Sequence, residues 1–148
     1  MTVHVKPYRE LTADELYGLL QLRVAVFVVE QDCVYQELDG KDRQAIHVWI
    51  EDERGVAGCL RVMPSGLQGD TVAIGRVVAR DRGCGLGRVL MLAGMEAARL
   101  YFGAEEIRLE AQSYACGFYE KLGFAQISEE FMEDGIPHVL MQWKVQTK

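Results

Sequence analysis

The stretch DRGCGLGRVLM, residues 81–91, places glycines at positions 83, 85 and 87 between two arginines and then turns apolar. A β-branched, apolar run at residues 71–79 precedes it, and apolar residues at helical spacing follow it as far as Gly103. This order predicts a buried strand, a tight turn and a helix that ends at Gly103. The first amides of a helix lack intrahelical partners and carry partial positive charge. These amides therefore either hydrogen-bond to water or bind an anion.

Three phosphate-binding patterns can be compared with this stretch. A P-loop requires GxxxxGK[ST], and no Lys-Ser or Lys-Thr pair follows these glycines. A dinucleotide fingerprint requires GxGxxG, whereas Gly83, Gly85 and Gly87 alternate. The third pattern, Arg/Gln-x-x-Gly-x-Gly/Ala, is matched by Arg82, Gly85 and Gly87. Glycine allows close approach to the backbone and positive φ, so phosphate oxygens can reach several amides there.

The rest of the chain predicts further strands and helices around this unit. Thr12 and Glu15 form a capping-box signature before a helix. This helix is expected to end within residues 27–42, and a loop follows it. Residues 47–63 read as a hairpin, and residues 113–124 as a short helix closed by Gly123. The other predicted strands are 3–8, 107–112, 125–131 and 138–145, the last two joined by a turn at 133–137.

A second motif lies one helix and one strand after the glycine stretch. Together, the two motifs resemble the GNAT superfamily of N-acetyltransferases, in which the first is the pyrophosphate-binding signature. QSYACGFYEKLGF, residues 112–124, is similar to that family's Asn-x-x-Ala-x-x-Phe-Tyr-Glu-Lys-x-Gly-Phe element, with Gln112 where asparagine is commoner. Residues 23–42 and 133–141 look like the ElaA-like branch, so the resemblance covers nearly the whole chain.

The resemblance implies one GNAT-like domain over residues 1–148, an α/β fold of about seven strands and three to four helices. The strands at 71–79 and 107–112 would form a central parallel pair that splays apart, with acetyl-CoA in the gap. The turn from Arg76 to Arg82 is tighter than is usual in the family. The implied coenzyme-binding residues are Val77, Val78, Ala79, Arg82, Gly83, Cys84, Gly85, Leu86, Gly87, Arg88, Gln112, Phe118 and Tyr119.

Acetyl transfer from a thioester to an amine needs a neutral amine, a stabilised carbonyl oxygen and a proton for the departing thiolate. The resemblance makes Tyr119 the acid, since the matching tyrosine points at the coenzyme sulfur. A tyrosine is protonated at neutral pH, because its ordinary pKa is about 10. The alternative is that the Tyr119 ring only packs in the core. A backbone amide near Val77 is the natural donor to the oxyanion.

The general base has several candidates. Glu110 shares a strand face with Gln112 and is predicted to face the cleft. Glu30 begins the loop on the acceptor side, and His138 follows the turn at 133–137 and has an ordinary pKa near the working range. An ordered water molecule that relays the proton is a fourth possibility.

Three further residues have two interpretations each. Arg76, a charge in an apolar strand, is either a paired structural ion or a contact for an anionic acceptor group. Cys84 and Cys116 lie near the predicted coenzyme site, where they are either inert packing or sites of oxidation or of mixed disulfides with coenzyme A.

Composition excludes several classes of protein. The net charge of −6 and the pI near 5.1 argue against nucleic-acid binding and mildly favour a cationic partner such as an amine. The four cysteines form no CxxC pair, so neither a zinc site nor a disulfide framework is expected, and no metal is required. No signal peptide or membrane span is apparent, which favours the cytoplasm.

The sequence therefore predicts an acetyl-CoA-dependent N-acetyltransferase that acts on a primary amine of a small molecule or a protein. A homodimer of this chain is one possible assembly. One alternative is an acyl-CoA-binding sensor without turnover. Another is an acyl-homoserine-lactone-type transferase, because Arg23–Phe27 resembles the start of those synthases. That family lacks a good Arg-x-x-Gly-x-Gly loop, which this chain has.

Overall fold

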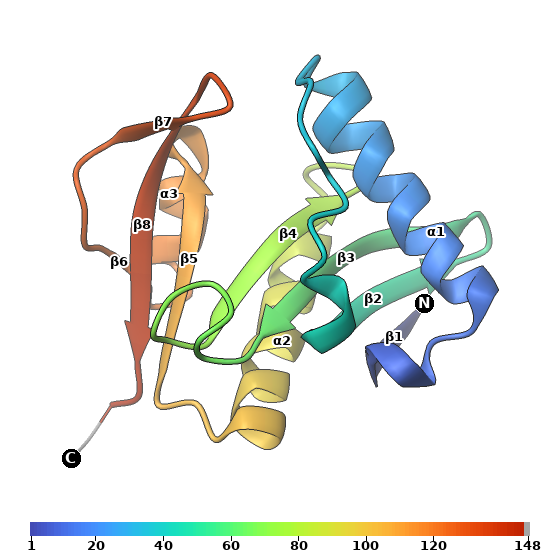
Figure 1. The fold of residues 1–148 in the computed structure, drawn as a ribbon, viewed down its shortest axis with the longest axis horizontal. Coiled ribbons are helices and arrows are strands. Elements are labelled where there is room, and N and C mark those ends of the chain that lie inside the picture. Colours follow the sequence, from blue (N-terminus) through green and yellow to red (C-terminus); the bar gives the residue numbers. More distant parts are fainter. Residues whose placement is uncertain (147–148) are drawn as a thin grey trace.

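The computed structural model describes residues 1–146, and its strands form one mixed sheet in the order β1-β2-β3-β4-β5-β8-β6, with β7 paired to β8 (Figure 1). The strands are β1 (Thr2–Pro7), β2 (Ile46–Asp52), β3 (Gly55–Met63), β4 (Ala73–Ala79), β5 (Glu106–Gln112), β6 (Ala125–Gln126), β7 (Phe131–Glu133) and β8 (Ile136–Lys144). The α-helices are α1 (Ala13–Arg23), α2 (Leu86–Phe102) and α3 (Cys116–Glu120). The predicted α/β fold with a mixed sheet is confirmed.

The prediction of one strand at 125–131 is wrong, because the structure has two short strands there, β6 and β7. β6 pairs with β8 at Gln142 and Met141, and β7 pairs with β8 nearer the hairpin turn. Between them, the Ser128 hydroxyl accepts a hydrogen bond from the Leu140 amide at 2.9 Å. A side chain thus takes the place of a ladder partner, which interrupts the strand. The sheet consequently has eight strands instead of about seven.

The predicted splayed pair is β4 and β5. The two strands are parallel and share a single register pair, Ala73 opposite Arg108. On its other edge β4 follows β3, but it has one residue more than β3 between Gly75 and Val78. Arg76 lies in this bulge with φ +52°, a region uncommon for residues other than glycine. A bulge bends its strand, so β4 turns away from β5 and opens a wedge (Figure 1).

The first helix is longer than its α-helical part. Its capping box is confirmed, since the Thr12 hydroxyl accepts from the Glu15 amide and the Glu15 carboxylate accepts from the Thr12 amide. After α1 the chain continues as a π-helical segment, η2 (Val24–Glu30), where a helix end and a loop were expected. Four of its seven residues are valines, whose branched side chains disfavour a regular α-helix. π-Turns occur frequently at functional sites, and this one borders the wedge.

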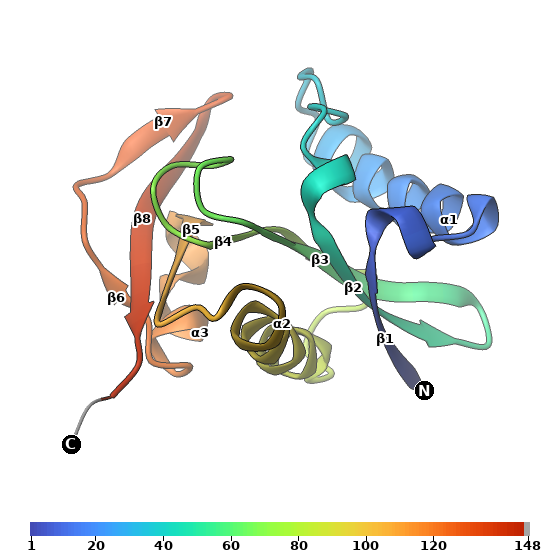
Figure 2. The same cartoon turned by 60° about the horizontal axis from the view of Figure 1, so that its bottom comes forward.

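The sheet buries apolar side chains on both faces, with α1 on one side and α2 on the other (Figure 2). The larger core lies under α2, where strand residues such as Val48 and Leu60 pack with Leu90 and Met91 of the helix. The smaller core lies under α1, where Leu19 packs with Trp49 and Val78. Both cores hold β4 in place. Among the described residues, no helix combines the length and the apolarity that a membrane span needs.

Candidate active site

A cavity of about 580 Å³ lies at the wedge between β4 and β5. Its walls come from β4, β5, η2, the loop that follows η2 and the β7–β8 hairpin. The Cys33 thiol lies 3.5 Å from the carbonyl oxygen of Asp134, so the loop after η2 contacts the hairpin. The cavity is therefore bounded by segments that are far apart in the sequence and meet only in the folded chain.

The glycine stretch forms the turn between β4 and α2, as predicted. Gly83 and Gly85 have φ of +77° and +81°, which side chains rarely tolerate, and Gly85 is the N-cap of α2. Gly87 has a different role, because a Cβ atom there would lie 3.1 Å from Cζ of Phe118. The glycines thus serve the turn at two positions and helix packing at the third. The first amides of α2 are left for an external acceptor.

The predicted coenzyme-binding residues divide into two groups. Val77, Val78, Ala79, Arg82, Gln112 and Tyr119 line the cavity. The segment 83–88 continues directly from Arg82, and Phe118 packs behind Gly87, so these residues border the cavity without forming its wall in the described chain. The Gln112 amide donates to the Gln31 side chain at 3.3 Å, which ties β5 to the end of η2. One end of the cavity therefore adjoins the N-terminus of α2.

Tyr119 lines the cavity from α3 and is 9% exposed. Its ring packs edge-on against Phe118 and Phe124, so core packing is part of its role. Its hydroxyl makes no hydrogen bond with another residue within 1–146. The hydroxyl oxygen is not fully enclosed by protein, so it opens on the cavity. Burial, with Tyr114 and Cys116 close by, raises the pKa of Tyr119 above its ordinary value. The hydroxyl is therefore protonated at neutral pH and able to donate.

Glu110 projects from β5 into the same cavity. Glu110 is an exposed residue, but the cavity walls beside it reduce the hydration of its carboxyl group. Burial, followed by a hydrogen bond and charge repulsion from Glu133, raises the pKa of Glu110 to about 7, while Lys41 and Arg76 oppose the shift. A carboxylate with such a pKa is a far better proton acceptor than an ordinary glutamate.

The two other candidate bases differ from Glu110 in position. Glu30 is exposed, lies outside the cavity wall of the described chain and pairs with Arg82 at 3.3 Å. His138 lines the cavity, but its Nδ1 lies 2.7 Å from the carbonyl oxygen of Ile136 and its ring stacks on Phe131. The geometry therefore places Glu110 and His138 together at the cavity and sets Glu30 apart from them.

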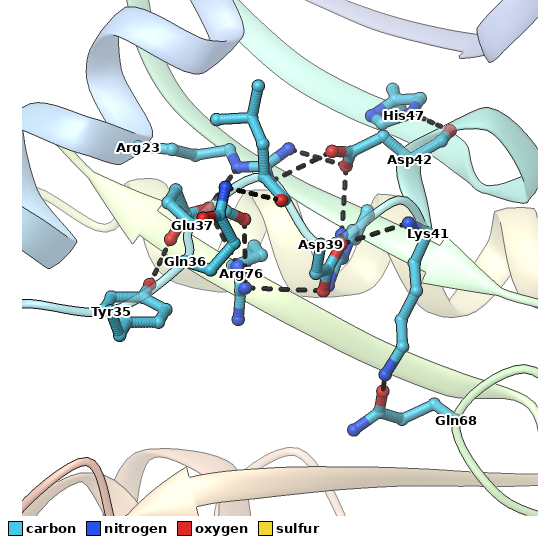
Figure 3. Close-up of polar contacts among 12 residues, drawn as sticks. Arg23, Tyr35, Gln36, Glu37, Asp39, Lys41, Asp42, His47, Gln68 and Arg76 are labelled. Carbon is cyan, nitrogen blue, oxygen red and sulfur yellow. Dashed lines mark hydrogen bonds and ion pairs between the residues drawn. The ribbon is translucent and has the colours of Figure 1, made fainter.

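The sequence interpretation did not foresee a buried ionic network beside the cavity (Figure 3). Three of its residues, Asp39, Arg61 and Arg76, line the cavity. Arg23 binds Glu37 at 2.8 Å and Asp42 at 2.7 Å, and Arg61 binds Asp39 at 2.6 Å and Asp42 at 3.0 Å. Burial alone would raise the pKa of Asp39 and of Asp42, but the hydrogen bonds from these arginines hold both below the ordinary value. We refer to Arg23, Glu37, Asp39, Asp42, Arg61 and Arg76 as the ionic network.

Arg76 belongs to this network, which supports the first of its two predicted roles, a paired structural ion. Its Nε donates to Glu37 at 2.8 Å and its Nη2 lies 3.4 Å from Asp39. Its guanidinium also lies over the Tyr35 ring, 5.4 Å from the centroid. A signal for the network was present in the sequence, because three carboxylates fall within residues 37–42 and three arginines interrupt otherwise apolar segments.

The cysteines near the site have ordinary surroundings. Cys84 is exposed, with its thiol 3.2 Å from the carbonyl oxygen of Asp81. Burial and the charge of Glu120 raise the pKa of Cys116, which lowers its thiolate fraction and hence its reactivity. Within residues 1–146, no group of three or more histidine, cysteine or acidic side chains is arranged to hold a metal ion.

Comparisons with known proteins agree with this architecture. The model of the acetyltransferase (GNAT) domain family matches residues 10–145. Protein ElaA of Escherichia coli K12 is 38% identical over 144 residues, which cover 93% of each chain. The crystal structure of an acyl-CoA N-acyltransferase from Pseudomonas aeruginosa superposes with a TM-score of 0.90 at 36% identity, covering 97% of this chain and 99% of that one. The E. coli ElaA crystal structure also gives a TM-score of 0.90, at 34% identity.

The fold is therefore that of the N-acyltransferases, which use acyl-CoA as a co-substrate. The chain belongs to the GNAT acetyltransferase family and is similar to ElaA. The resemblance predicted from the two motifs is confirmed.

Proposed function

We propose that this protein is an acetyl-CoA-dependent N-acetyltransferase that acetylates a primary amine of a small molecule or peptide. The observation that carries this proposal is the cavity in the β4–β5 wedge, which adjoins the glycine turn at the N-terminus of α2. Family membership supports the acyl-CoA donor and the amine acceptor as classes. The family match over residues 10–145 supports the further proposal that the chain is a single domain.

The donor's diphosphate would bind at residues 82–88. Gly83 and Gly85 hold the backbone in a conformation that leaves the first amides of α2 open, and the helix dipole favours negative charge there. Val77–Ala79, on the side of β4 that faces the wedge, would pair with the pantetheine arm as an added strand. This arrangement directs the thioester into the cavity, towards Tyr119.

The acetyl transfer requires three proton movements. The Glu110 carboxylate takes one proton from the acceptor ammonium, and the freed nitrogen lone pair forms a bond to the thioester carbonyl carbon. A β4 amide near Val77 stabilises the oxygen as it gains charge. The C–S bond breaks, and Tyr119 donates its proton to the sulfur. The second N–H proton leaves as the amide forms and replaces the one that Tyr119 gave.

Among the candidate bases, Glu110 fits this role best. It combines a place in the cavity with a pKa of about 7, raised by burial and by Glu133. Glu30 is engaged with Arg82 outside the cavity, and the His138 ring nitrogen Nδ1 is engaged with a carbonyl oxygen. A water molecule between Glu110 and the amine is compatible with this assignment.

Two glycines at opposite ends of α2 provide a matched test of the diphosphate site. Gly85 and Gly103 both have left-handed φ, and a Cβ atom at either would meet nothing within 4 Å. Each change to alanine should therefore cost about 1–2 kcal/mol of stability for the same reason. Only Gly85→Ala should also weaken coenzyme A binding, by about tenfold or more, because a charge-assisted hydrogen bond is worth about 1.5–3 kcal/mol. Isothermal titration of the two variants measures the difference.

Equal coenzyme affinities for Gly85→Ala and Gly103→Ala would contradict the proposed diphosphate site. The same titration also separates the enzyme from its two alternatives. Binding of acetyl-CoA without turnover of any amine would indicate a sensor. Turnover only with an acceptor that forms a homoserine lactone would indicate an acyl-homoserine-lactone-type transferase.

A further inference from the structure

The acceptor side of the cavity carries an excess of acidic side chains. Arg61 and Arg76 line this side, but the ionic network matches its three arginines with three carboxylates. Lys41 donates to the neutral side chain of Gln68, and Arg108 to that of Gln142. Four further carboxylates line the cavity: Asp70, Glu110, Glu133 and Asp134. Arg82 also lines the cavity but pairs with Glu30. Four carboxylates and two cations of the lining are then left outside these ion pairs, and this unpaired charge favours a cation.

Glu110 and Glu133 form a pair across this wall. Glu110 lies on β5, whereas Glu133 ends β7 at the hairpin that extends beyond the end of β5 (Figure 1). Both side chains line the cavity, and after burial Glu133 is the main cause of the raised pKa of Glu110, so the two carboxyl groups lie close together. Two carboxyl groups in such contact share a proton, since both cannot easily be charged at once. Arrival of a cation between them relieves the repulsion.

A second observation places the reacting end of the acceptor at this pair. Tyr119, about nine-tenths buried, opens its hydroxyl on the same cavity and has no hydrogen-bond partner within residues 1–146. A hydroxyl that opens on a cavity and makes no hydrogen bond within the protein is free to donate one to a ligand there. Tyr119, Glu110 and Glu133 therefore border the same cavity, in which the coenzyme sulfur and the acceptor nitrogen can meet.

We propose that Glu110 and Glu133 together bind the ammonium group of the acceptor, and that the acceptor is an aliphatic amine without a carboxylate on its chain. This inference rests on the proposed function. Glu110 is the group that takes the proton, and Glu133 is a positioning residue that raises the proton affinity of Glu110. The groups that face Glu110 are Glu133 from β7, His138 from β8, Arg76 from β4 and Lys41 from the loop before β2.

Three amines of equal chain length test the acceptor class. With acetyl-CoA as donor, 1-aminopentane and 1,5-diaminopentane should have a kcat/KM at least tenfold higher than 5-aminopentanoate, because the carboxylate of the last is repelled by the acidic wall. Equal or higher kcat/KM with 5-aminopentanoate would overturn the inference, and would instead point to Lys41 or Arg108 as a carboxylate site.

The pH profile tests the pair itself. The kcat/KM of the unmodified protein should rise to a plateau through a pKa near 7, since Glu110 must be ionised to act. Glu133→Gln removes the repulsion but not the burial, so the rise in kcat/KM should move to lower pH. The discrimination against 5-aminopentanoate should also narrow. Glu129→Gln, an exposed acid outside the cavity wall, is the matched control and should change neither. An unmoved profile in Glu133→Gln would refute the role of Glu133.

A measurement without turnover separates this inference from the proposed function. Carboxyl-carbon NMR of the protein with coenzyme A added should show Glu110 titrating near pH 7, and at a lower pH in Glu133→Gln. Addition of 1-aminopentane should shift the Glu110 and Glu133 signals. If no amine is acetylated but these shifts appear, the proposed transfer fails and the ammonium site stands. If amines are acetylated and the signals do not respond, the inference alone fails.

Discussion

Tyr119→Phe is expected to lower kcat by about 10²–10⁴-fold, the usual contribution of a general acid. The hydroxyl makes no hydrogen bond to another residue within 1–146, so its removal breaks no internal contact. The ring keeps its edge-on packing with Phe118 and Phe124. Coenzyme A affinity and the midpoint of unfolding should therefore stay close to those of the unmodified protein. Steady-state kinetics, together with titration calorimetry, measure the two effects separately.

Tyr17→Phe is the control, because Tyr17 is 70% exposed on α1 and lies outside the cavity wall. It should leave kcat unchanged. A Tyr119→Phe variant whose kcat stays within threefold of the unmodified protein would remove Tyr119 from the acid role and leave core packing as its whole function. A fall in kcat that coincides with lost coenzyme binding would indicate a structural effect instead.

Arg23→Met is expected to destabilise the fold by about 3–5 kcal/mol, the cost of removing one partner of a buried ion pair. The Arg23 side chain is 3% exposed and binds both Glu37 and Asp42. Methionine keeps most of the apolar stem, but the Glu37 carboxylate, itself 3% exposed, loses one of its two arginine partners and keeps Arg76 and the Tyr35 hydroxyl. Urea unfolding at neutral pH measures the loss.

The exposed Arg99–Glu96 pair on α2 supplies the comparison. Arg99→Met removes the same kind of charge from the surface, where ion pairs contribute little, and should leave the unfolding midpoint unchanged. If Arg23→Met were as stable as Arg99→Met, the ionic network would not be needed to hold residues 37–42 against β3 and β4.

The parts of the structure that could be predicted from the sequence depend on local pattern. Residues 71–103 predict a strand, a turn and a helix because apolar spacing and glycine conformation act within a few residues. Thr12 and Glu15 predict their capping box for the same reason. The π-helical turn of Val24–Glu30 was missed, because clustered valines weaken a helix without specifying what replaces it.

The parts of the site that could not be predicted depend on contacts between distant residues. Arg76, which lies in the bulge of β4, meets Glu37 from 39 positions away. Glu110 lines the cavity, and its pKa is raised by burial and then by Glu133, which comes from a hairpin whose shape the sequence did not predict. Periodicity shows which face of a strand a residue occupies, and it does not show which loop will cover that face.

The central claim is that the main-chain amides of residues 82–88 bind the diphosphate of acetyl-CoA, so that the thioester enters the β4–β5 wedge. A crystal structure of the complex with coenzyme A tests it most directly. The account predicts diphosphate oxygens within hydrogen-bonding distance of those amides, and the sulfur in the cavity beside Tyr119. A nucleotide bound away from the N-terminus of α2 would contradict it.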